Sequence, residues 1–391
     1  MRILHISQSY PPMVSGAALA VAHLAEGAAA EGHDVTVIAA SDREVGYVEE
    51  TGRIRVCRLP ARDNPARVGQ RYLLWPQRHI QALVTSPRPD IVHLHEPLLL
   101  GLCTVRIMRR LQIPLVVTLH QLPWFVTKYA PSFGGQPLNV EWLVWRYGGW
   151  FMRQCEAAIV PLPLVSNLVH HYTGYLPHTI SYGIDLKRFR TEVAALTEGA
   201  QLRRKYGLPA GKPIILHVGR LDRDKDVDQV IRAAAEAMAT TDAILLVVGD
   251  GREREALVQL SEALAIGDRA FFTGFVDNDG DLPGLYRLAT LFVTASEIET
   301  FGIVVLEAMA SGCPVVAVNA GAVPHLVLTG YSGFLVPPGD VAAIADRVAW
   351  LLAHPEAARR MGQNAAGLSQ EYDGARSLER HLDLYRAICG G

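Results

Sequence analysis

Short apolar segments alternate with longer segments of helical periodicity along the whole chain. Apolar runs of about four to eight residues bounded by turn residues are typical of buried strands. Ala17–Glu31 and Val227–Ala239 have the apolar spacing of amphipathic helices. We expect a first series of strands at Arg2–Ser7, Val35–Ala40, Ile54–Leu59, Ile91–His95, Leu115–His120, Ala157–Pro161 and His178–Tyr182. A second series is expected at Ile214–Val218, Ile244–Val248, Ala270–Thr273, Leu291–Thr294, Val315–Val318 and Gly333–Val336.

This alternation predicts an α/β protein, because strands that alternate with helices form parallel sheets with helices packed on their faces. Two series of strands indicate two sheets and two domains. The chain is long enough for both, since it has 391 residues of which 50% are apolar. Neither series has G-x-G-x-x-G after its first strand, which disfavours a nicotinamide-dependent enzyme.

Composition excludes several other classes of protein. The formal net charge of −2 gives no reason to expect a nucleic-acid partner. The five cysteines are scattered without metal-ligand spacing, which favours a reducing compartment. The N-terminal sequence MRILHIS is typical of a strand rather than a signal peptide, and the uncharged stretch 308–338 is interrupted by glycine and proline. We expect a soluble, cytoplasmic protein, with peripheral contact at the inner membrane face left open.

The most informative stretch, residues 297–317, is typical of a loop, a helix, a turn and a strand. Gly302 is expected to open the helix and Gly312 to close it. The helix is apolar on nearly every side, so it is expected to be buried. The free amides of Ile303 and Val304 at its N-terminus would form an anion site.

Two carboxylates flank this anion site. Glu307 lies inside the helix, where a carboxylate is costly unless it has a partner, and Glu299 lies in the preceding loop. One carboxylate can accept hydrogen bonds from sugar hydroxyls and the other from ribose hydroxyls, with phosphates between them. The alternative interpretation is a loop Glu in solvent and a helix Glu paired with a distant Arg.

Glu299 and Glu307, with seven residues between them, resemble the E-x7-E motif of retaining glycosyltransferases of family GT4. Residues 297–317 are similar to that family almost residue by residue, and the resemblance is strongest from about Ser181 to Pro338. It implies the GT-B fold, in which two Rossmann-like parallel-sheet domains face each other across a cleft. It also implies a hexosyltransferase that uses a nucleotide-diphosphate sugar, and UDP is favoured by its frequency in the family.

The domain boundary also follows from this resemblance. Residues 181–189, SYGIDLKRF, resemble the N-G-V-D-x-x-x-F segment that leads into the second domain of the family, with Tyr182 in place of Asn. We therefore expect an N-terminal acceptor-binding domain over residues 1–184 and a C-terminal nucleotide-sugar-binding domain over residues 185–371. The last helix, about residues 372–391, is expected to return to the first domain, as it does in the family.

Two cations lie on the loop after the first strand of the second series. Residues 219–226 resemble the family's G-R-x-x-x-x-K-G, in which the Arg and the Lys hold the diphosphate, with Asp226 in place of the usual Gly. Arg220 and Lys225 suit that role, because Arg binds phosphate bidentately and Lys acts as a point charge. A solvated run of charges is the alternative.

Acidic residues alternate with these cations, which gives a metal site as a second interpretation of the loop. The spacing does not match a calcium-binding EF-hand, since Val227 stands where such a loop requires glycine. We interpret the acidic residues as loop and helix N-cap groups and expect no metal and no cofactor. They are Asp222, Asp224, Asp226 and Asp228.

The resemblance assigns other strand-end residues to the donor site. Gly249 lies in a segment like the family's V-G-x-G, and Val276 ends a G-x-V segment whose backbone contacts the base. Gly16 matches the second glycine of P-P-x-x-G-G, whereas Ser15 replaces the first, and a positive φ there would strain the backbone. Ordinary turn chemistry is the alternative for these segments. The expected donor residues are Gly16, Arg220, Lys225, Gly249, Val276, Glu299, Phe301, Gly302, Ile303, Val304 and Glu307.

Two histidines end strands of the first series. His120 lies at the carboxyl end of its strand, where parallel sheets bind ligands, and the resemblance implies that it approaches the transferred sugar. His95 ends another strand and is expected to line the acceptor side, together with Trp124 and Phe125. A structural role is the alternative for both histidines.

Basic and aromatic residues are unevenly distributed in the first domain. Residues 51–88 contain eight Arg and one Asp, and four of the six tryptophans lie between positions 124 and 150. Such groups suit an anionic lipid surface. The alternative, which we favour, is that the aromatics form the core and the cleft walls.

The sequence therefore predicts a metal-independent retaining hexosyltransferase with His120, Glu299, Arg220 and Lys225 as catalytic residues. The expected partners are a nucleotide-diphosphate sugar and an acceptor hydroxyl on a soluble sugar, glycoside or small metabolite. The alternatives are a membrane lipid or glycolipid acceptor, a sugar-nucleotide epimerase of related fold, and a binding protein without turnover. The sequence does not specify the hexose, the base, the acceptor or the oligomeric state.

Overall fold

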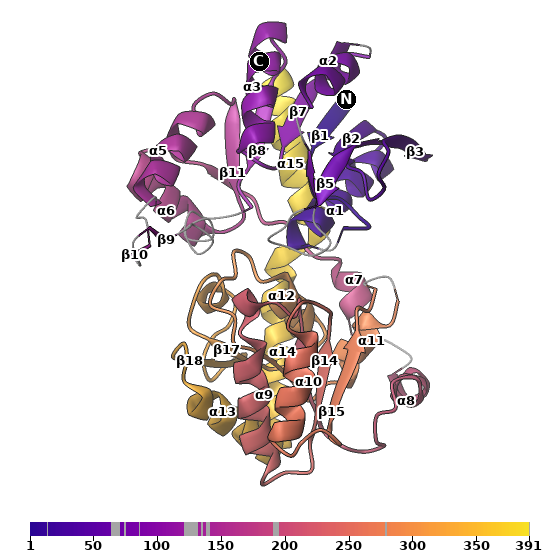
Figure 1. Ribbon diagram of the computed structural model, residues 1–391, viewed down its shortest axis with the longest axis vertical. Coiled ribbons are helices and arrows are strands. Elements are labelled where there is room, and N and C mark those ends of the chain that lie inside the picture. Colours follow the sequence, from indigo (N-terminus) through magenta and orange to yellow (C-terminus); the bar gives the residue numbers. More distant parts are fainter. Residues whose placement is uncertain are drawn as a thin grey trace. The chain divides into compact units, whose positions relative to one another are not determined.

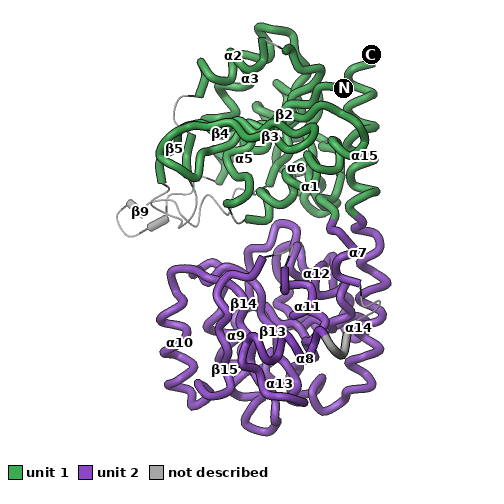
Figure 2. The backbone as a smooth tube through the Cα atoms, turned by 90° about the vertical axis from the view of Figure 1, so that its right-hand side faces the viewer, with its two compact units in different colours: residues 1–183, 374–391 green, residues 184–373 purple. Residues whose placement is uncertain are grey.

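The computed structural model describes residues 1–13, 15–63, 71–73, 76–85, 87–120, 132–133, 136–137, 141–190, 195–277 and 280–390. The chain forms two compact units (Figure 2). Unit 1 comprises Met1–Gly183 with Gly374–Gly391, and unit 2 comprises Ile184–Asp373. These divisions lie within two residues of the boundaries that the sequence places at 184 and 372.

An eight-stranded sheet forms the centre of unit 1 (Figure 1). Its strands lie in the order β12-β11-β8-β7-β1-β2-β4-β3, and all neighbouring pairs are parallel except β3 with β4. Every strand expected from an apolar run in this unit is present. These strands are β1 (Arg2–Ile6), β2 (Asp34–Ala40), β4 (Ile54–Leu59), β7 (Ile91–Leu94), β8 (Leu115–Thr118), β11 (Ala157–Val160) and β12 (His178–Thr179).

The sequence pattern misses the strand at one edge of this sheet. β3 (Tyr47–Thr51) pairs antiparallel with β4, and it carries no apolar run because its residues face solvent. Two small antiparallel hairpins are missed as well, since each of their strands is too short to show a period. They are β5 (Ala61–Asp63) with β6 (Arg71–Leu73), and β9 (Ser132–Phe133) with β10 (Gln136–Pro137).

The helices of unit 1 pack on this sheet and include one from the end of the chain. They are α1 (Gly16–Ala30), α2 (Gln77–Thr85), α3 (Leu99–Leu111), α5 (Glu141–Met152), α6 (Pro163–Thr173) and α15 (Gly374–Cys389). α15 packs beside α1 (Figure 1). Leu382 and Tyr385 of α15 are buried in the same apolar cluster as Val21 and Ala25 of α1. The last described helix therefore completes the core of unit 1.

A six-stranded parallel sheet forms the centre of unit 2, with the order β15-β14-β13-β16-β17-β18. The expected strands are again all present. They are β13 (Ile214–Val218), β14 (Ile244–Val248), β15 (Ala270–Gly274), β16 (Leu291–Thr294), β17 (Val315–Val318) and β18 (Gly333–Val336). Most are fully buried, as expected for parallel strands with both faces covered.

Helices cover the sheet of unit 2. α9 packs against α10 and α13, and α12 packs against α11 and α14. The helical segments are α7 (Leu186–Phe189), α8 (Ala195–Lys205), η1 (Arg223–Lys225), α9 (Val227–Met238), α10 (Arg254–Ala263), α11 (Leu282–Leu288), α12 (Ile303–Ala310), η2 (Val323–His325), α13 (Val341–Ala353), α14 (Pro355–Ser369) and η3 (Gln370–Tyr372). None of the helices in the described ranges has both the length and the apolar composition that a membrane crossing requires.

Candidate functional site

The loops that follow β13, β14 and β15 meet at the carboxyl edge of the unit 2 sheet. The amide of Gly219 donates to the carbonyl of Val248 (3.0 Å), and the amide of Gly249 donates to the carbonyl of Gly274 (2.9 Å). Gly249 has φ 139, and a Cβ there would lie 1.9 Å from the Gly219 carbonyl oxygen. Only glycine fits this position, because any side chain would separate the loops. Val276 is half-buried just beyond β15.

Arg220 points at carboxylates on its own loop. Its guanidinium donates to Asp222 and, at 3.0 Å, to the nearly buried Asp224. The expectation that the acidic residues act as N-caps is therefore wrong for their side chains: Asp222 precedes η1 and Asp226 precedes α9, but neither side chain caps its helix. An adjacent guanidinium attracts a carboxylate more strongly than a neutral amide does, since both partners of the hydrogen bond are charged.

Asp226 occupies the position at which the G-R-x-x-x-x-K-G motif has glycine, and its backbone has the conformation that glycine favours. It has φ 49 and ψ 39, the left-handed conformation that glycine adopts without steric cost and that Asp tolerates. The loop thus keeps its path, and the next described element, α9, begins at Val227.

Lys225 and Glu299 form an ion pair between two loops of unit 2. Their side chains are 17% and 15% exposed, so the pair is mostly shielded from solvent. The neighbouring His217 donates from Nδ1 to the Val293 carbonyl (3.0 Å), and burial lowers the pKa of its imidazole to about 4. A neutral imidazole therefore lies beside the ion pair at neutral pH.

Glu307 has a partner that the sequence did not reveal. It is 3% exposed in α12, and Tyr286 of α11 donates from its hydroxyl to Glu307 Oε2 (2.9 Å). Burial, followed by the nearby Glu307 charge, raises the pKa of Tyr286 well above its usual range. Tyr286 is therefore protonated and acts as a hydrogen-bond donor to the carboxylate.

The N-terminus of α12 lies between the two glutamates in the chain. Gly302 is its N-cap with φ 82, and its carbonyl accepts from the amides of Val305 and Leu306. In the described parts of the chain, the amides of Ile303 and Val304 donate to no backbone carbonyl. Phe301 is buried before the helix. Two free amides at a helix N-terminus form a site that favours anions.

The two histidines expected in the site lie at the carboxyl edge of the unit 1 sheet. His120 follows β8 and is 8% exposed, and His95 follows β7 and is 3% exposed. Both ring nitrogens of His95 face other histidines: Nδ1 lies 3.0 Å from His120 Nε2, and Nε2 lies 3.2 Å from His5 Nδ1. His95 therefore contacts His120 rather than a ligand-facing surface. Trp124 and Phe125 lie outside the described residues.

The four buried histidines of this sheet, His5, His93, His95 and His120, are neutral at pH 7. Burial lowers the pKa of His5 and of His120 to about 3, with the charge of His381 as a second cause. Burial and neighbouring imidazoles hold the pKa values of His93 and His95 well below their usual range. Each of these rings therefore carries one proton, on one of its two nitrogens.

Ser15 does not have the strained backbone that its place in the glycine motif suggested. Its φ is −160, and its hydroxyl accepts from the amide of Ala18 (3.1 Å) as the N-cap of α1. Gly16 is the first residue of that helix. Serine is among the preferred N-cap residues, which explains the substitution.

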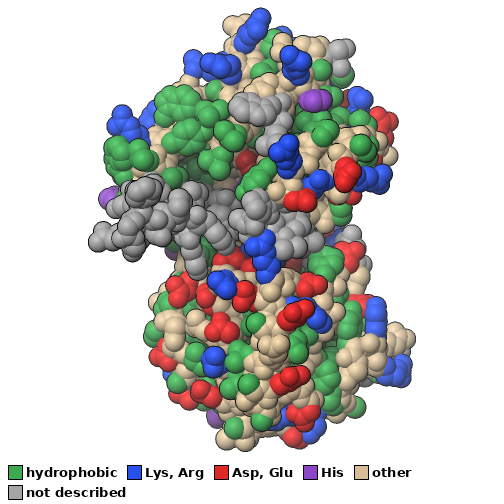
Figure 3. All heavy atoms as spheres, viewed as in Figure 1, with side chains coloured by type: hydrophobic (Ala, Val, Ile, Leu, Met, Phe, Trp, Pro, Cys, Tyr) green, Lys and Arg blue, Asp and Glu red, His purple; other side chains and the backbone are tan. Residues whose placement is uncertain are grey.

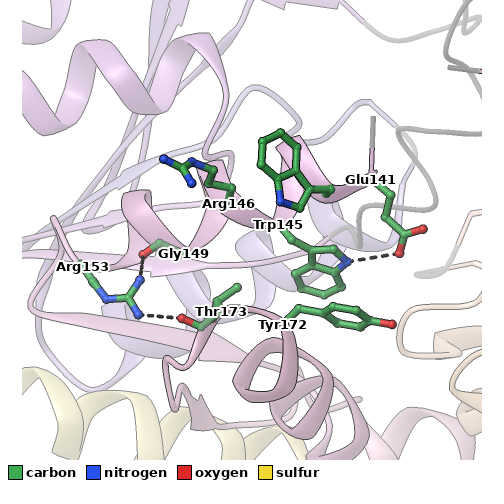
Figure 4. Close-up of a pocket in the computed structure, with 8 residues that line it drawn as sticks. Glu141, Trp145, Arg146, Gly149, Arg153, Tyr172 and Thr173 are labelled. Atoms are coloured by element: carbon green, nitrogen blue, oxygen red, sulfur yellow. Dashed lines mark hydrogen bonds between the residues drawn. The ribbon is translucent and has the colours of Figure 1, made fainter. Parts of the chain in front are cut away.

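Unit 1 has a further concave feature, a pocket of about 510 Å³ between α5 and α6 (Figure 4). Trp145 stacks on Tyr172 at 4.7 Å between ring centroids, and its indole N–H donates to Glu141 (3.2 Å). Arg153 donates to the Gly149 and Thr173 carbonyls at one end. The pocket thus combines aromatic faces with a carboxylate and arginines.

Comparison with known proteins identifies the family. Residues 14–188 match the family described as Glycosyltransferase Family 4, and residues 199–367 match Glycosyl transferases group 1. GDP-mannose-dependent alpha-mannosyltransferase of Mycobacterium tuberculosis is 30% identical over 90% of this chain and 88% of its own. The chain belongs to glycosyltransferase family 4. The structure and the family together make this glycosyltransferase a GT-B enzyme, as the sequence predicted.

Other relatives of this glycosyltransferase differ in their sequence identity to it and in the share of the chain that they match. N-acetyl-alpha-D-glucosaminyl L-malate synthase of Bacillus anthracis is 37% identical, but the match spans only 48% of each chain. Sucrose-phosphate synthase from Thermosynechococcus elongatus has a TM-score of 0.81 at 26% identity, covering 99% of this chain and 98% of its own. Anabaena HepE, solved in complex with UDP-glucose, has a TM-score of 0.79 at 21% identity, covering 99% and 100%.

Sequence reasoning missed several residues that lie near the candidate site residues within each unit. Asp222 and Asp224 as partners of Arg220, and Tyr286 as the donor to Glu307, appear only in the structure. Glu96 was missed as well: its carboxylate accepts from the amide of Gln8 (2.9 Å), and burial raises its pKa to about 7. The position of Glu96 directly after His95 at a strand end was the available signal.

Proposed function

We propose that this glycosyltransferase moves a hexose from a UDP-sugar to a hydroxyl of a soluble acceptor, with retention of the anomeric configuration. The observation that carries the proposal is the charge arrangement at the carboxyl edge of the unit 2 sheet. Arg220, Lys225 and two free amides of α12 are cationic or partly positive, and Glu299 and Glu307 accompany them. This set suits a diphosphate flanked by two hydroxyl-bearing sugars.

The cations would stabilise the leaving diphosphate. Arg220 and Lys225 are each paired with carboxylates, so a bound phosphate would exchange one anionic partner for another. Such an exchange avoids leaving a cation without a partner in a shielded site. The α12 amides add preorganised donors, which are most effective where charge develops during the reaction.

The two glutamates would have different roles. When a phosphate takes the place of Glu299 beside Lys225, the Glu299 carboxylate becomes available for hydroxyls of the transferred sugar. Glu307 is held by Tyr286 in a buried helix, which suits an acceptor of hydrogen bonds from the ribose. His120 would support the transferred sugar from unit 1.

The transfer step balances without an added base. The bond between the anomeric carbon and the phosphate oxygen breaks, and a bond to the acceptor oxygen forms on the same face. The acceptor's proton passes to the leaving phosphate oxygen. Neither a metal ion nor a cofactor is needed, because Arg220 and Lys225 neutralise the phosphate charge.

The donor is tested by nucleotide binding. UDP, GDP and ADP are added to the protein and the melting temperature is measured, followed by hydrolysis of the matching sugar nucleotides. HepE with UDP-glucose supports UDP, and the GDP-mannose-dependent relative makes GDP the competing outcome. The protein is also incubated with the sugar nucleotide and no acceptor. If the sugar of that nucleotide is not epimerised, an epimerase is excluded. Transfer of the sugar to any acceptor excludes a binding protein without turnover.

A lipid acceptor is a second candidate, favoured by one observation on unit 1. Hydrophobic side chains gather beside α3 and α5, with Arg side chains at their margin (Figure 3). Leu99 is 72% exposed and Trp142 is 63% exposed, with the Arg146 guanidinium 5.8 Å from the Trp142 ring centre. Apolar residues beside arginines suit an anionic membrane surface.

Vesicles separate the two candidates. A lipid acceptor predicts binding to vesicles with anionic headgroups that weakens with salt, and reduced binding for Trp142→Ala. Tyr331→Ala, which removes an exposed aromatic of unit 2, is the matched control and should bind like the parent. A protein that ignores such vesicles at low salt has a soluble acceptor.

A further inference from the structure

One face of the unit 1 sheet carries a buried layer of histidines. His5 of β1 and His93 of β7 are partners in the parallel register, and His95 and His120 follow β7 and β8. The four residues are between 0% and 8% exposed. His381 of α15 lies against this layer, with its ring 5.9 Å from that of His93.

Three of these imidazoles form a continuous chain. His5 Nδ1 lies 3.2 Å from His95 Nε2, and His95 Nδ1 lies 3.0 Å from His120 Nε2. The two outer nitrogens, His5 Nε2 and His120 Nδ1, are buried and have no hydrogen-bond partner among the described residues. The row of hydrogen-bonded imidazoles therefore runs from His5 through His95 to His120, so the proton position at one end is linked to that at the other.

We propose that His5 and His95 act as positioning residues that set which ring nitrogen of His120 carries its proton. Each link of the chain needs one N–H and one bare nitrogen, and each neutral ring has one of each. The three rings therefore share two consistent arrangements: all three protonated at Nδ1, or all three at Nε2. A mixed arrangement places two protons or two lone pairs against each other and loses a buried hydrogen bond.

The burial of His5 selects between these arrangements. Each arrangement leaves one outer N–H without an acceptor among the described residues: that of His5 when all protons are on Nε2, and that of His120 when all are on Nδ1. His5 is 0% exposed, so no acceptor can reach its N–H, whereas His120 is 8% exposed at the carboxyl edge, where parallel sheets bind ligands. With all protons on Nδ1, His5 Nε2 is a bare nitrogen and His120 presents an Nδ1–H donor. The structure thus assigns His120 as a donor to an oxygen atom. This role rests on the proposed function, in which that oxygen belongs to the transferred sugar.

The same cluster has the composition of a metal site, since ligand nitrogens of His5, His93 and His95 lie within 4.8 Å of one another. The hydrogen bonds of these histidines favour a chain of neutral imidazoles over a metal site. His93 Nε2 lies 2.7 Å from the Thr118 hydroxyl and its Nδ1 contacts the Tyr385 hydroxyl, so both of its nitrogens are engaged. His5 and His95 each use one ring nitrogen in the hydrogen bond between them.

Nitrogen NMR tests the proposal without any substrate. In protein labelled with ¹⁵N-histidine at pH 7.5, two-bond correlations between ring nitrogens and ring carbon-bound hydrogens identify each tautomer. We expect His5, His95 and His120 as Nδ1–H tautomers, whereas the exposed His170 and His171 serve as references for solvent-exposed rings. His120 in the Nε2–H form, or nitrogen shifts of a metal-bound ring together with metal in elemental analysis, would overturn the proposal.

A pair of variants tests the link to activity. Glutamine at position 95 can accept at its oxygen and donate at its nitrogen, as His95 does, whereas leucine can do neither. His95→Leu should mix the His120 tautomers and lower kcat by about tenfold or more, as loss of an orienting partner commonly does, with a smaller change in the donor KM. His95→Gln should keep the His120 tautomer and most of kcat.

His381→Leu is the matched control. It also removes a buried imidazole from this layer, but the His381 Nδ1–H donates to Ser377 of its own helix rather than to the chain. His120 should keep its tautomer in this variant. If His95→Leu and His381→Leu lose kcat equally and the His120 tautomer is unchanged in both, His95 has only a structural role and the proposal is wrong. A parent protein that transfers no sugar refutes the proposed function, while the tautomer assignment is still decided by NMR.

Discussion

The ammonium group of Lys225 pairs with the carboxylate of Glu299, although 74 positions separate them in the sequence. The two residues come from the loops after β13 and β16, which are neighbouring strands of the unit 2 sheet. Because both side chains are shielded from solvent, each satisfies the charge of the other. In the proposed function, a phosphate that takes the place of Glu299 beside Lys225 releases that carboxylate for the sugar.

The first prediction concerns the two cations. Lys225→Ala and Arg220→Ala should each lower kcat/KM on the order of 10²-fold or more, because each removes a preorganised partner of the leaving phosphate. Steady-state kinetics with a saturating acceptor measures the effect. Lys212→Ala is the control, since Lys212 also pairs with a carboxylate of unit 2, that of Asp242, but on an exposed surface. If both site variants turn over like Lys212→Ala, the phosphate assignment is wrong.

The second prediction separates the two glutamates. Glu299→Gln should mainly lower kcat, because the sugar changes shape and charge during transfer, and Glu307→Gln should mainly raise the donor KM. Tyr286→Phe removes the hydrogen bond to Glu307 and should shift KM in the same direction as Glu307→Gln. If Glu299→Gln and Glu307→Gln change kcat by the same factor and the donor KM by the same factor, the two glutamates do not have different roles.

The third prediction is that activity does not require a divalent metal. The carboxylates of Asp222 and Asp224 are engaged by Arg220, and the phosphate charge is met by cations and helix amides. Treatment with a chelator should therefore leave the initial rate nearly unchanged. Loss of activity that magnesium or manganese restores would revive the acidic loop as a metal site.

The fourth prediction concerns acid stability. His381 has a pKa of about 4 in the folded chain because it is buried, whereas an unfolded histidine has its ordinary pKa of 6.5. Unfolding therefore takes up a proton between these values, and the stabilisation present above pH 6.5 is lost as the pH falls toward 4. From pH 7.5 to pH 5, this group alone should lower the free energy of unfolding by about 2 kcal/mol.

Urea unfolding at the two pH values measures this loss. His5 and His120 act in the same direction, since burial lowers their pKa values to about 3. His381→Leu should lose less stability between pH 7.5 and pH 5 than the parent, whatever its stability at pH 7.5. An equal loss in both proteins would contradict the assignment of His381 as a buried neutral ring.

The apolar pattern was sufficient for the framework of the fold but not for its edges or its polar contacts. Ile244–Val248 was predicted as a strand with the bounds that the structure shows, because a parallel strand buried on both faces is apolar throughout. Ile214–Val218, which is apolar except for His217, was also predicted with its observed bounds. β3 (Tyr47–Thr51) was missed, because an exposed edge strand needs no apolar residues.

Side-chain pairing was beyond the reach of the sequence for a different reason. Glu307 was known to need a partner, but that partner, Tyr286, lies 21 positions away on another helix, and no local pattern selects it. His5 was likewise an ordinary residue of the first strand until the register placed it beside His93 and its ring next to His95. Motifs selected the charged residues of the candidate site, and the fold determined which groups they contact.

The return of α15 to unit 1 has a consequence for the synthesis of the protein. Residues 184–373 are contiguous, so unit 2 has its whole sequence once Asp373 has left the ribosome. Unit 1 begins first but must wait, because Leu382 and Tyr385 fill the apolar cluster between α1 and its sheet. Of the two units, the one that is translated first is therefore the later to close its core, and until then the apolar face of α1 is open to chaperones.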